Sequence, residues 1–375
     1  MNKLLIIIPM VVAVFVLYTF LSPGITKEDN ASNNTNPPIA LAEFQSVKDA
    51  PIELGQVDWI RNFDEATLKA KEQNKPLLVL FQEVPGCNTS SGYGKNVLSH
   101  PLIVEAIESL FVPVAVYNNH KGEDEKVLNS FGEPSWNNPV VRIITPERKE
   151  LVSRLNGDYT KAGLVRAMIT ALENNNKAVP SYLSLLAQEL NVNNGRSDRA
   201  VFAMHCFWVG EGKLANVNGV ISTKPGFMGG HEVIELEYNP DIISYEDLVK
   251  KARSQNVARH IFTENSEQSS IAKKIVGESA VSPKGTFRAD SRPKYYLSGT
   301  SYKYVPMTNT QIARVNAAIG GLQSPNIFLS PRQVEIYNYI QGHQDLNWPN
   351  MVSSSNFNSS WDKTVSLLNN QISRR

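Results

Sequence analysis

Runs of apolar residues divide this chain into two patterned regions, which follow a long apolar segment and a polar one. Residues 4–21 carry no charge over 18 positions, whereas Asn, Ser, Thr and Pro dominate residues 23–50. Residues 23–50 therefore have little apolar surface to bury, which is typical of a flexible tether. Patterning resumes near Ile52, stops after about Leu190 and resumes near Ala200. We therefore expect, in order, an anchor or signal at 1–22, a flexible linker at 23–50, and globular domains at 51–190 and 199–375, the second with a C-terminal extension.

The apolar segment at residues 4–21 predicts a transmembrane helix. Eighteen helical residues span about 27 Å, close to the roughly 30 Å core of a bilayer. Lys3 is the one charged side chain before the segment, which favours an N-terminus on the cytoplasmic side. We therefore expect a membrane-anchored protein whose domains lie on the extracytoplasmic (periplasmic) side. A cleaved signal peptide and a buried core helix stay open as alternatives, although no small-x-small cleavage site follows.

The first domain reads as alternating strands and helices. A continuous apolar run at 75–82 predicts a buried central strand, and a turn after it carries Cys87. A second strand, 111–117, follows a helix whose start is marked by Ser99 and Pro101. We further expect a short helix at 124–131, strands at 140–145 and 150–155, and a helix at 160–174.

A cysteine just after the first strand and a proline opening a later strand make this order thioredoxin-like. Over most of 52–175 the chain resembles the VPGUxxT family of thioredoxin-like (seleno)proteins, in which U is selenocysteine. Residues 84–90 here read VPGCNTS. The resemblance implies that Cys87 is the reactive thiol, that Ser90 stands at the threonine, and that Pro139 is the cis-proline facing the sulfur.

A thiol at a helix N-terminus has a lowered pKa. Ser90 can donate a hydrogen bond to Cys87 but cannot form a disulfide with it. The alternative is that Cys87 is a small buried apolar residue, against which its polar, glycine-rich surroundings argue. Gly92 and Gly94 argue against a regular helix beginning directly after Cys87.

The second domain carries the stretch AMHCFWVGE, in which the cysteine is Cys206. This stretch resembles the GCFWGxE signature of A-type peptide methionine sulfoxide reductases. Four further matches follow in the family's order: GFMGG at 226–230, HEVIELEYNP at 231–240, ISYEDL at 243–248, and Asp290 with Tyr295. The implied fold class is α/β and α+β: a thioredoxin-like domain, then a reductase-like domain with a ferredoxin-like core, with the N-terminal transmembrane helix before both.

Reduction of a sulfoxide begins with attack of a thiolate on sulfur. The departing oxygen needs a proton donor, and the substrate's methyl group needs an apolar wall. The resemblance implies these roles: Cys206 as nucleophile, Glu232 as proton donor, Asp290 and Tyr295 holding the oxygen and a water, and Phe207, Trp208 and Phe227 binding the substrate.

Each of these assignments has a plainer alternative. Phe207 and Trp208 could be core aromatics, Glu232 could belong to the polar face of a strand, and Asp290 and Tyr295 could be surface residues. The chain also departs from the family, with His205 in place of a glycine, a displaced glycine after the aromatics, and a shortened segment after the glycine pair. Phe227 replaces a tyrosine, and losing one such donor costs on the order of 2.7–4 kcal/mol in measured sites.

Charge and cysteine count narrow the chemistry further. The formal net charge is +1, which gives no support to nucleic-acid binding. Two cysteines exclude a four-thiolate zinc site, an iron–sulfur cluster and a multi-disulfide framework. None of the six histidines has metal-ligand spacing to another. We therefore expect no metal or other cofactor, and an external thiol reductant such as thioredoxin, or a membrane electron donor.

The two cysteines can combine in three ways. Cys87 could attack oxidised Cys206 as an interdomain resolving thiol, the pair could form a permanent structural bridge, or each thiol could react separately. We expect a peptide-methionine (S)-S-oxide reductase that repairs oxidised methionine during oxidative stress. The alternatives are a thiol oxidoreductase or peroxidase centred on Cys87 with a degenerate second domain, and a catalytically inactive interaction protein.

Overall fold

The computed structural model describes residues 50–193, 197–352 and 356–372. The expected apolar helix at 4–21 and nearly all of the linker lie outside these ranges. Among the described residues, no helix has the length and apolar character needed to cross a membrane. The predicted transmembrane helix is therefore not supported, and the described fold consists of mixed α/β domains. The extracytoplasmic location stays a prediction.

The first domain is built on a four-stranded mixed sheet in the order β2-β1-β3-β4. Strand β1 is fully buried, pairs with β2 in parallel and pairs with β3 antiparallel, which confirms the predicted central strand. The elements of this domain are α1 (Phe63–Gln73), β1 (Leu77–Gln82), α2 (Asn88–Asn96), α3 (Pro101–Leu110), β2 (Val112–Tyr117), α4 (Glu123–Ser130), β3 (Val140–Ile144), β4 (Leu155–Asn156), α5 (Lys161–Asn174) and α6 (Ser181–Asn193), after a 3-10 turn at Ile52–Leu54.

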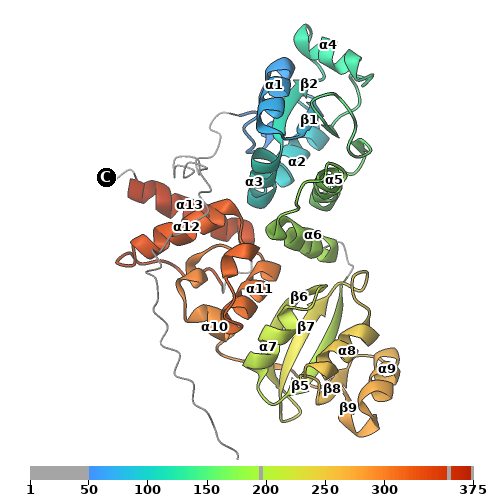
Figure 1. Cartoon of the computed structure of the whole chain (residues 1–375), viewed down its shortest axis with the longest axis vertical. Coiled ribbons are helices and arrows are strands. Elements are labelled where there is room, and N and C mark those ends of the chain that lie inside the picture. The colour runs from blue at the N-terminus through green and yellow to red at the C-terminus, as the bar shows by residue number, and fades with distance from the viewer. Residues whose placement is uncertain (1–49, 194–196, 353–355, 373–375) are drawn as a thin grey trace, which may run out of the picture. The chain divides into compact units, whose positions relative to one another are not determined.

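Helices cover both faces of this sheet (Figure 1). Leu78 and Leu80 of β1 face a core formed with α2, α3, α5 and α6. Leu77, Val79 and Phe81 face the opposite core, with α1 and α4. Burial on both faces explains why β1 reads as an unbroken apolar run instead of an alternating one.

Two local predictions in this domain were wrong. Helix α2 begins directly after Cys87 and contains Gly94, which does not interrupt it. A Cβ at Gly94 would lie 1.9 Å from the carbonyl oxygen of Ile52, so the glycine permits a close backbone approach. The strand expected at 150–155 is reduced to β4 at Leu155–Asn156 and a single bridge between Glu150 and Ile144.

The second domain has a six-stranded sheet in the order β10-β6-β7-β5-β8-β9. Its first elements are β5 (Asp198–Met204), α7 (Phe207–Ala215), β6 (Val220–Met228), β7 (His231–Tyr238), α8 (Tyr245–Ser254) and β8 (His260–Thr263). Their βαββαβ sequence and the antiparallel order β6-β7-β5-β8 give the ferredoxin-like core. Helices α7 and α8 pack on one face of this sheet (Figure 1). The sheet is extended by β9 (Val281–Pro283), after α9 (Ser266–Val276), and by β10 (Arg288–Ala289).

The C-terminal extension forms a helical layer with its own apolar core. Its helices are α10 (Tyr295–Ser298), α11 (Asn309–Gly320), α12 (Pro331–Gly342) and α13 (Phe357–Ile372). Helix α12 begins at Pro331, with a capping box between Ser330 and Gln333. Helix α11 joins the reductase-like domain through Ala313 and Ala317, which pack against Ala215 of α7.

Candidate functional site

Cys206 occupies the N-cap position of α7, separated by one residue from the end of strand β5. Its thiol is free and half-buried. Strand β5 is the central strand of the ferredoxin-like core, so its end is fixed by neighbours on both sides. The cysteine therefore lies at a rigid strand-to-helix junction.

The glycine displaced from its family position has a packing role here. Gly210 lies within α7, and a Cβ there would be 1.7 Å from the sulfur of Met204. Met204 is buried at the end of β5, two residues before Cys206. The glycine therefore lets α7 pack closely against the strand that leads to the thiol.

Strand register brings Glu232 and Phe227 to this junction. In β7, Glu232 is paired with Met204 of β5 on one side and with Phe227 of β6 on the other. The β6–β7 hairpin turns at Gly229 and Gly230, both with positive φ. Because nothing separates the glycine pair from His231, the pair itself forms a two-residue turn, and this turn places Phe227 directly opposite Glu232. The carboxylate accepts a hydrogen bond from the backbone amide of Phe207 at 2.9 Å, beside Cys206.

Aromatic rings gather at the same place. Phe207 stacks on Trp208 with ring centroids 5.6 Å apart, and Phe227 lies 5.4 Å from Phe207. Tyr295 stacks on Trp208 at 4.1 Å with an interplanar angle of 13°. Phe207 is buried, whereas Tyr295 is 41% exposed and covers the indole from outside. The rings form an apolar wall next to Glu232.

The segment from β10 to α10 supplies the remaining polar groups. The Asp290 amide donates to the carbonyl oxygen of Pro225 at 2.9 Å, and its carboxylate lies 3.5 Å from the indole nitrogen of Trp208. The structure therefore brings together all seven residues predicted for the sulfoxide site: Cys206, Phe207, Trp208, Phe227, Glu232, Asp290 and Tyr295.

Tyr296 also belongs to this site, and the sequence analysis missed it. Burial raises the pKa of the Tyr296 phenol, and the negative charge of the nearby Cys206 sulfur raises it further. The phenol therefore stays protonated to a higher pH than an ordinary tyrosine, and its electrostatic interaction with Cys206 places it near that residue. The paired tyrosines at 295–296 were the available signal, but spacing from Asp290 pointed to the first of them.

Cys87 forms a separate site in the first domain. It is the N-cap residue of α2 and is exposed to solvent. Its sulfur lies 3.7 Å from the hydroxyl oxygen of Ser90, whose single proton can be donated either to that sulfur or to the side-chain oxygen of Asn138, 2.5 Å away. The Asn138–Pro139 peptide bond is cis, as the resemblance implies. Cys87, Ser90 and the loop before β3 thus come together.

Hydrogen bonds lower the pKa of the Cys87 thiol. The largest contributions come from the backbone amide and the hydroxyl of Ser90, burial of the thiol opposes them, and Thr89 adds smaller hydrogen-bond contributions. The turn itself is held by the buried carboxylate of Glu53, which accepts hydrogen bonds from the Gly86 amide and the Ser91 hydroxyl. The first-turn groups of α2 therefore stabilise an exposed thiolate.

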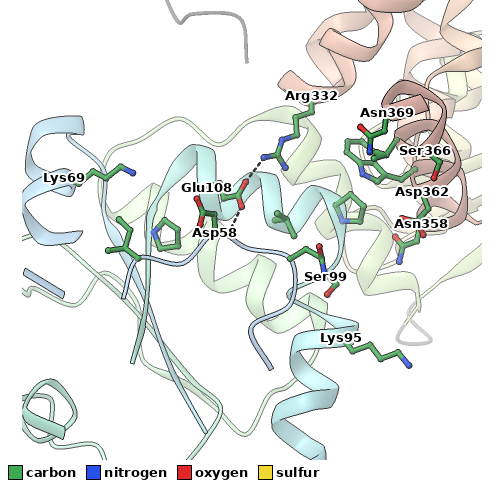
Figure 2. Close-up of a pocket in the computed structure, with 17 residues that line it drawn as sticks. Asp58, Lys69, Lys95, Ser99, Glu108, Arg332, Asn358, Asp362, Ser366 and Asn369 are labelled. Atoms are coloured by element: carbon green, nitrogen blue, oxygen red, sulfur yellow. Dashed lines mark hydrogen bonds and ion pairs between the residues drawn. The ribbon is translucent and has the colours of Figure 1, made fainter. Parts of the chain in front are cut away.

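Both cysteines are free thiols. The structure thus contains no permanent bridge between them, and it leaves the two reactive groups in separate environments. A third feature, a polar groove, lies beside α3, α12 and α13 (Figure 2). Arg332 in this groove pairs with Glu108 at 2.6 Å, and the groove contains no residue of either thiol site. Within the described ranges, no cluster of three or more His, Cys, Asp or Glu could hold a metal ion.

Comparison with known families bears on the first domain directly. Residues 58–146 match the family model described as Thioredoxin-like. The first domain is thioredoxin-like. The match lies within the first sheet and its covering helices, and it includes Cys87, Ser90 and Pro139.

Curated relatives bear on the second domain. Peptide methionine sulfoxide reductase MsrA of Methanococcus maripaludis is 39% identical over 71 residues, covering 14% of this chain and 45% of that protein. The mitochondrial peptide methionine sulfoxide reductase of Mus musculus is 40% identical over 68 residues, covering 14% and 29%. MsrA of Streptococcus agalactiae is 31% identical over 109 residues, covering 20% and 64%. The chain thus spans less than half the length of the first relatives, and the matches support a thioredoxin-like domain fused to an MsrA-like one.

Two solved structures are also similar in part. Methionine sulfoxide reductase A of Corynebacterium diphtheriae has a TM-score of 0.25 at 19% identity, over 30% of this chain and 78% of that one. A structure described as DsbH Oxidoreductase has a TM-score of 0.28 at 19% identity, over 34% and 94%.

Proposed function

We propose that this protein is a peptide-methionine (S)-S-oxide reductase that uses Cys206 as its nucleophile. The observation that carries the proposal is the convergence at Cys206 of a carboxylate, an aromatic wall and phenols drawn from distant parts of the chain. Identity of 39% to a peptide methionine sulfoxide reductase over 71 residues supports it.

The reaction requires these groups in defined roles. The Cys206 sulfur attacks the sulfoxide sulfur while Phe207 and Trp208 enclose the methyl group. Glu232, with the Tyr296 phenol, protonates the oxygen as its bond to the substrate sulfur breaks. The attack forms a bond between the two sulfur atoms. The protonated oxygen then moves to the Cys206 sulfur as that bond breaks, and the electron pair of the broken bond stays on the substrate sulfur. The substrate sulfur thereby gains two electrons and becomes a thioether, and Cys206 loses two and becomes a sulfenic acid carrying the oxygen.

A thiol must then reduce the sulfenic acid. Attack by a second thiol forms a disulfide to Cys206 and releases the oxygen as water, and an external dithiol reduces that disulfide and becomes oxidised. We propose Cys87 as this second thiol, because its lowered pKa and exposure favour nucleophilic attack. We further propose that its domain is the cysteine form of the VPGUxxT family, on the match of residues 84–90 to that motif. Thioredoxin-type proteins are the proposed electron donors.

Single-turnover chemistry tests this function without any assumption about the electron donor. The reduced protein is mixed with a peptide containing methionine-S-sulfoxide and with dimedone, which traps sulfenic acids. We expect one methionine formed per protein and a dimedone adduct at Cys206, which increases in the Cys87→Ser variant. An adduct at Cys87 in place of Cys206 would support the second candidate, a thiol oxidoreductase centred on Cys87, which the exposure of that thiol favours.

A further inference from the structure

A buried charged network lies behind the Cys206 site. Glu211 of α7 is fully buried, and its carboxylate pairs with the ammonium of Lys294 at 2.5 Å. The ammonium also donates to the hydroxyl of Thr223 in β6 at 2.8 Å. Asn316 of α11 donates to the second carboxylate oxygen at 3.1 Å. We call these four residues the Glu211 network.

The network joins the nucleophile's helix to the segment that carries the phenols. Glu211 follows Cys206 by five residues in α7, whereas Lys294 immediately precedes Tyr295 and Tyr296. Lys294 has a left-handed backbone, with φ 58°, and its side chain is buried while its neighbours at 291–293 are exposed. Asn316 fixes the other side of the tyrosines, because its side-chain oxygen accepts a hydrogen bond from the amide of Leu297.

Regular structure does little to hold this segment in place. Strand β10 has two residues and α10 has four, and both flank an exposed loop. The position of the phenols relative to Cys206 therefore depends on side-chain anchors. Leu297 is one of these, fully buried in the C-terminal core. Lys294 is the charged one, and its ammonium has three hydrogen-bond acceptors in the interior.

A buried ion pair is a poor source of stability, because desolvation of both charges offsets their attraction. An apolar pair of similar volume would serve packing equally well. The charged pair does supply one fixed geometry, since the ammonium has to reach the carboxylate. We propose that Lys294 is a positioning residue for the Cys206 site: paired with Glu211, it sets where Tyr295 and Tyr296 stand relative to the thiol. The kinetic effects expected from this proposal depend on the proposed reductase function.

The kinetic test compares Lys294→Met with Lys274→Met, which changes an exposed lysine of α9 in the same domain. We expect Lys294→Met to lower kcat for sulfoxide reduction about 100-fold while KM changes less than about threefold, since misplaced phenols affect the leaving oxygen more than substrate binding. A folded Lys294→Met variant with kcat within about twofold of Lys274→Met would overturn the proposal.

Loss of Lys294 leaves a buried carboxylate unpaired and can unfold the domain. The double variant Glu211→Gln with Lys294→Gln removes both charges and keeps hydrogen-bonding groups at both positions. We expect it to recover kcat to within about fivefold of the unsubstituted protein, because a hydrogen bond between the two glutamines can hold the tyrosines in the same position. A folded double variant as slow as about 1% of the unsubstituted protein would contradict a positioning role.

A second measurement separates this inference from the reductase assignment. In a Cys87→Ser background, the limiting rate of Cys206 alkylation by iodoacetamide is measured at alkaline pH, where it reports access to the sulfur. We expect Lys294→Met to raise this rate about threefold or more, because displaced tyrosines uncover the half-buried thiol. Lys274→Met leaves the rate unchanged. If the unsubstituted protein reduces no sulfoxide, the proposed function fails, and an unchanged alkylation rate in Lys294→Met separately defeats the positioning role.

Discussion

The chemistry of the Cys206 site depends on a few atoms whose neighbours are set by strand register. Glu232 lies between Met204 and Phe227 across three strands, and its carboxylate is held by the amide of Phe207. The ring of Phe227 meets Phe207 on one side and the guanidinium of Arg288 on the other. Phe227 therefore contributes shape to the site and no hydroxyl.

Restoring a hydroxyl at position 227 is expected to speed the reaction. Phe227→Tyr adds one donor beside Glu232 that can stabilise charge on the sulfoxide oxygen. We expect kcat to rise about tenfold with KM nearly unchanged, measured as dithiothreitol-driven reduction of a sulfoxide peptide. Phe227→Leu, which removes the ring without adding a donor, serves as the control and is expected to be slower than the unsubstituted protein. A Phe227→Tyr variant no faster than the unsubstituted protein would mean that the oxygen does not bind near this ring.

At the first site, Ser90 controls the reactivity of Cys87. Its backbone amide and hydroxyl are the largest causes of the lowered pKa, and only the hydroxyl is removed by Ser90→Ala. The pKa of Cys87 then rises, the thiolate fraction at pH 7 falls, and alkylation slows about threefold to tenfold with its pH profile displaced upward. Iodoacetamide kinetics in a Cys206→Ser background measure this. Ser91→Ala, whose hydroxyl donates to Glu53, is the matched control; identical profiles for the two variants would refute the role of Ser90.

Elements were predictable where one local signal dominated. The apolar runs of β1 and β2 and the helix α5 all appear where the sequence places them. Helix α2 was obscured because Gly94 has low helix propensity, yet its tertiary contact with Ile52 requires a glycine. The strand at 150–155 failed because apolar alternation alone cannot show whether a partner strand extends that far.

Helix α7 offers a matched pair of glycines that tests its packing. A Cβ at Gly210 would meet the sulfur of buried Met204, whereas a Cβ at Gly212 meets nothing within 4 Å. We expect Gly210→Ala to lower the free energy of unfolding by about 1–3 kcal/mol through overpacking. Gly212→Ala is expected to raise it by about 0.5–1 kcal/mol, because alanine favours the helix. Urea denaturation of both variants measures the difference, and equal effects would contradict the close contact between α7 and β5.

Over the whole molecule, the C-terminal helices contact both domains through polar side chains. Glu105 of α3 is buried, and its carboxylate accepts a hydrogen bond at 2.8 Å from the amide of Arg332 in the first turn of α12. Thr310, at the start of α11, likewise donates its amide to Glu189 of α6. The N-termini of two C-terminal helices are therefore capped by carboxylates of the first domain.

Burial raises the pKa of Glu105 to about 7, and hydrogen bonds from Ser330 and Arg332 oppose the rise. The folded protein thus keeps this proton at pH values where the unfolded chain, titrating near 4.5, has lost it. The contribution of Glu105 to the free energy of unfolding falls as pH rises from about 4.5 to 7, by up to about 3 kcal/mol. Glu105→Gln keeps an acceptor for Arg332 and removes this dependence.

Unfolding in urea at pH 5 and pH 8 tests this. Glu105→Gln is expected to be more stable than the unsubstituted protein at pH 8 and similar to it at pH 5. Glu278→Gln changes an exposed glutamate and is expected to follow the unsubstituted protein at both values. If the three proteins lose stability in parallel between the two pH values, Glu105 does not carry the pH dependence.

The candidate site could be anticipated from motifs, but its assembly could not. Cys206 and Glu232 are 26 residues apart and meet because β5 and β7 are neighbours in the sheet. Resemblance to a family predicted that these two residues share a site, whereas the local hydrophobic pattern did not. Lys294 stood in a basic, loop-rich stretch with no pattern to mark it as buried. Its role emerges only from the fold, where it reaches Glu211 from 83 residues away.

The central claim is that Cys206 reduces methionine sulfoxide, and dithiothreitol-driven turnover tests it most directly. A chemical dithiol replaces both the external donor and Cys87, so the measurement reports the Cys206 site alone. We predict steady reduction of a peptide methionine-S-sulfoxide by the protein and by Cys87→Ser, and none by Cys206→Ser. Folded protein without turnover, or turnover that survives in Cys206→Ser and is lost in Cys87→Ser, would contradict the claim and make Cys87 the active centre.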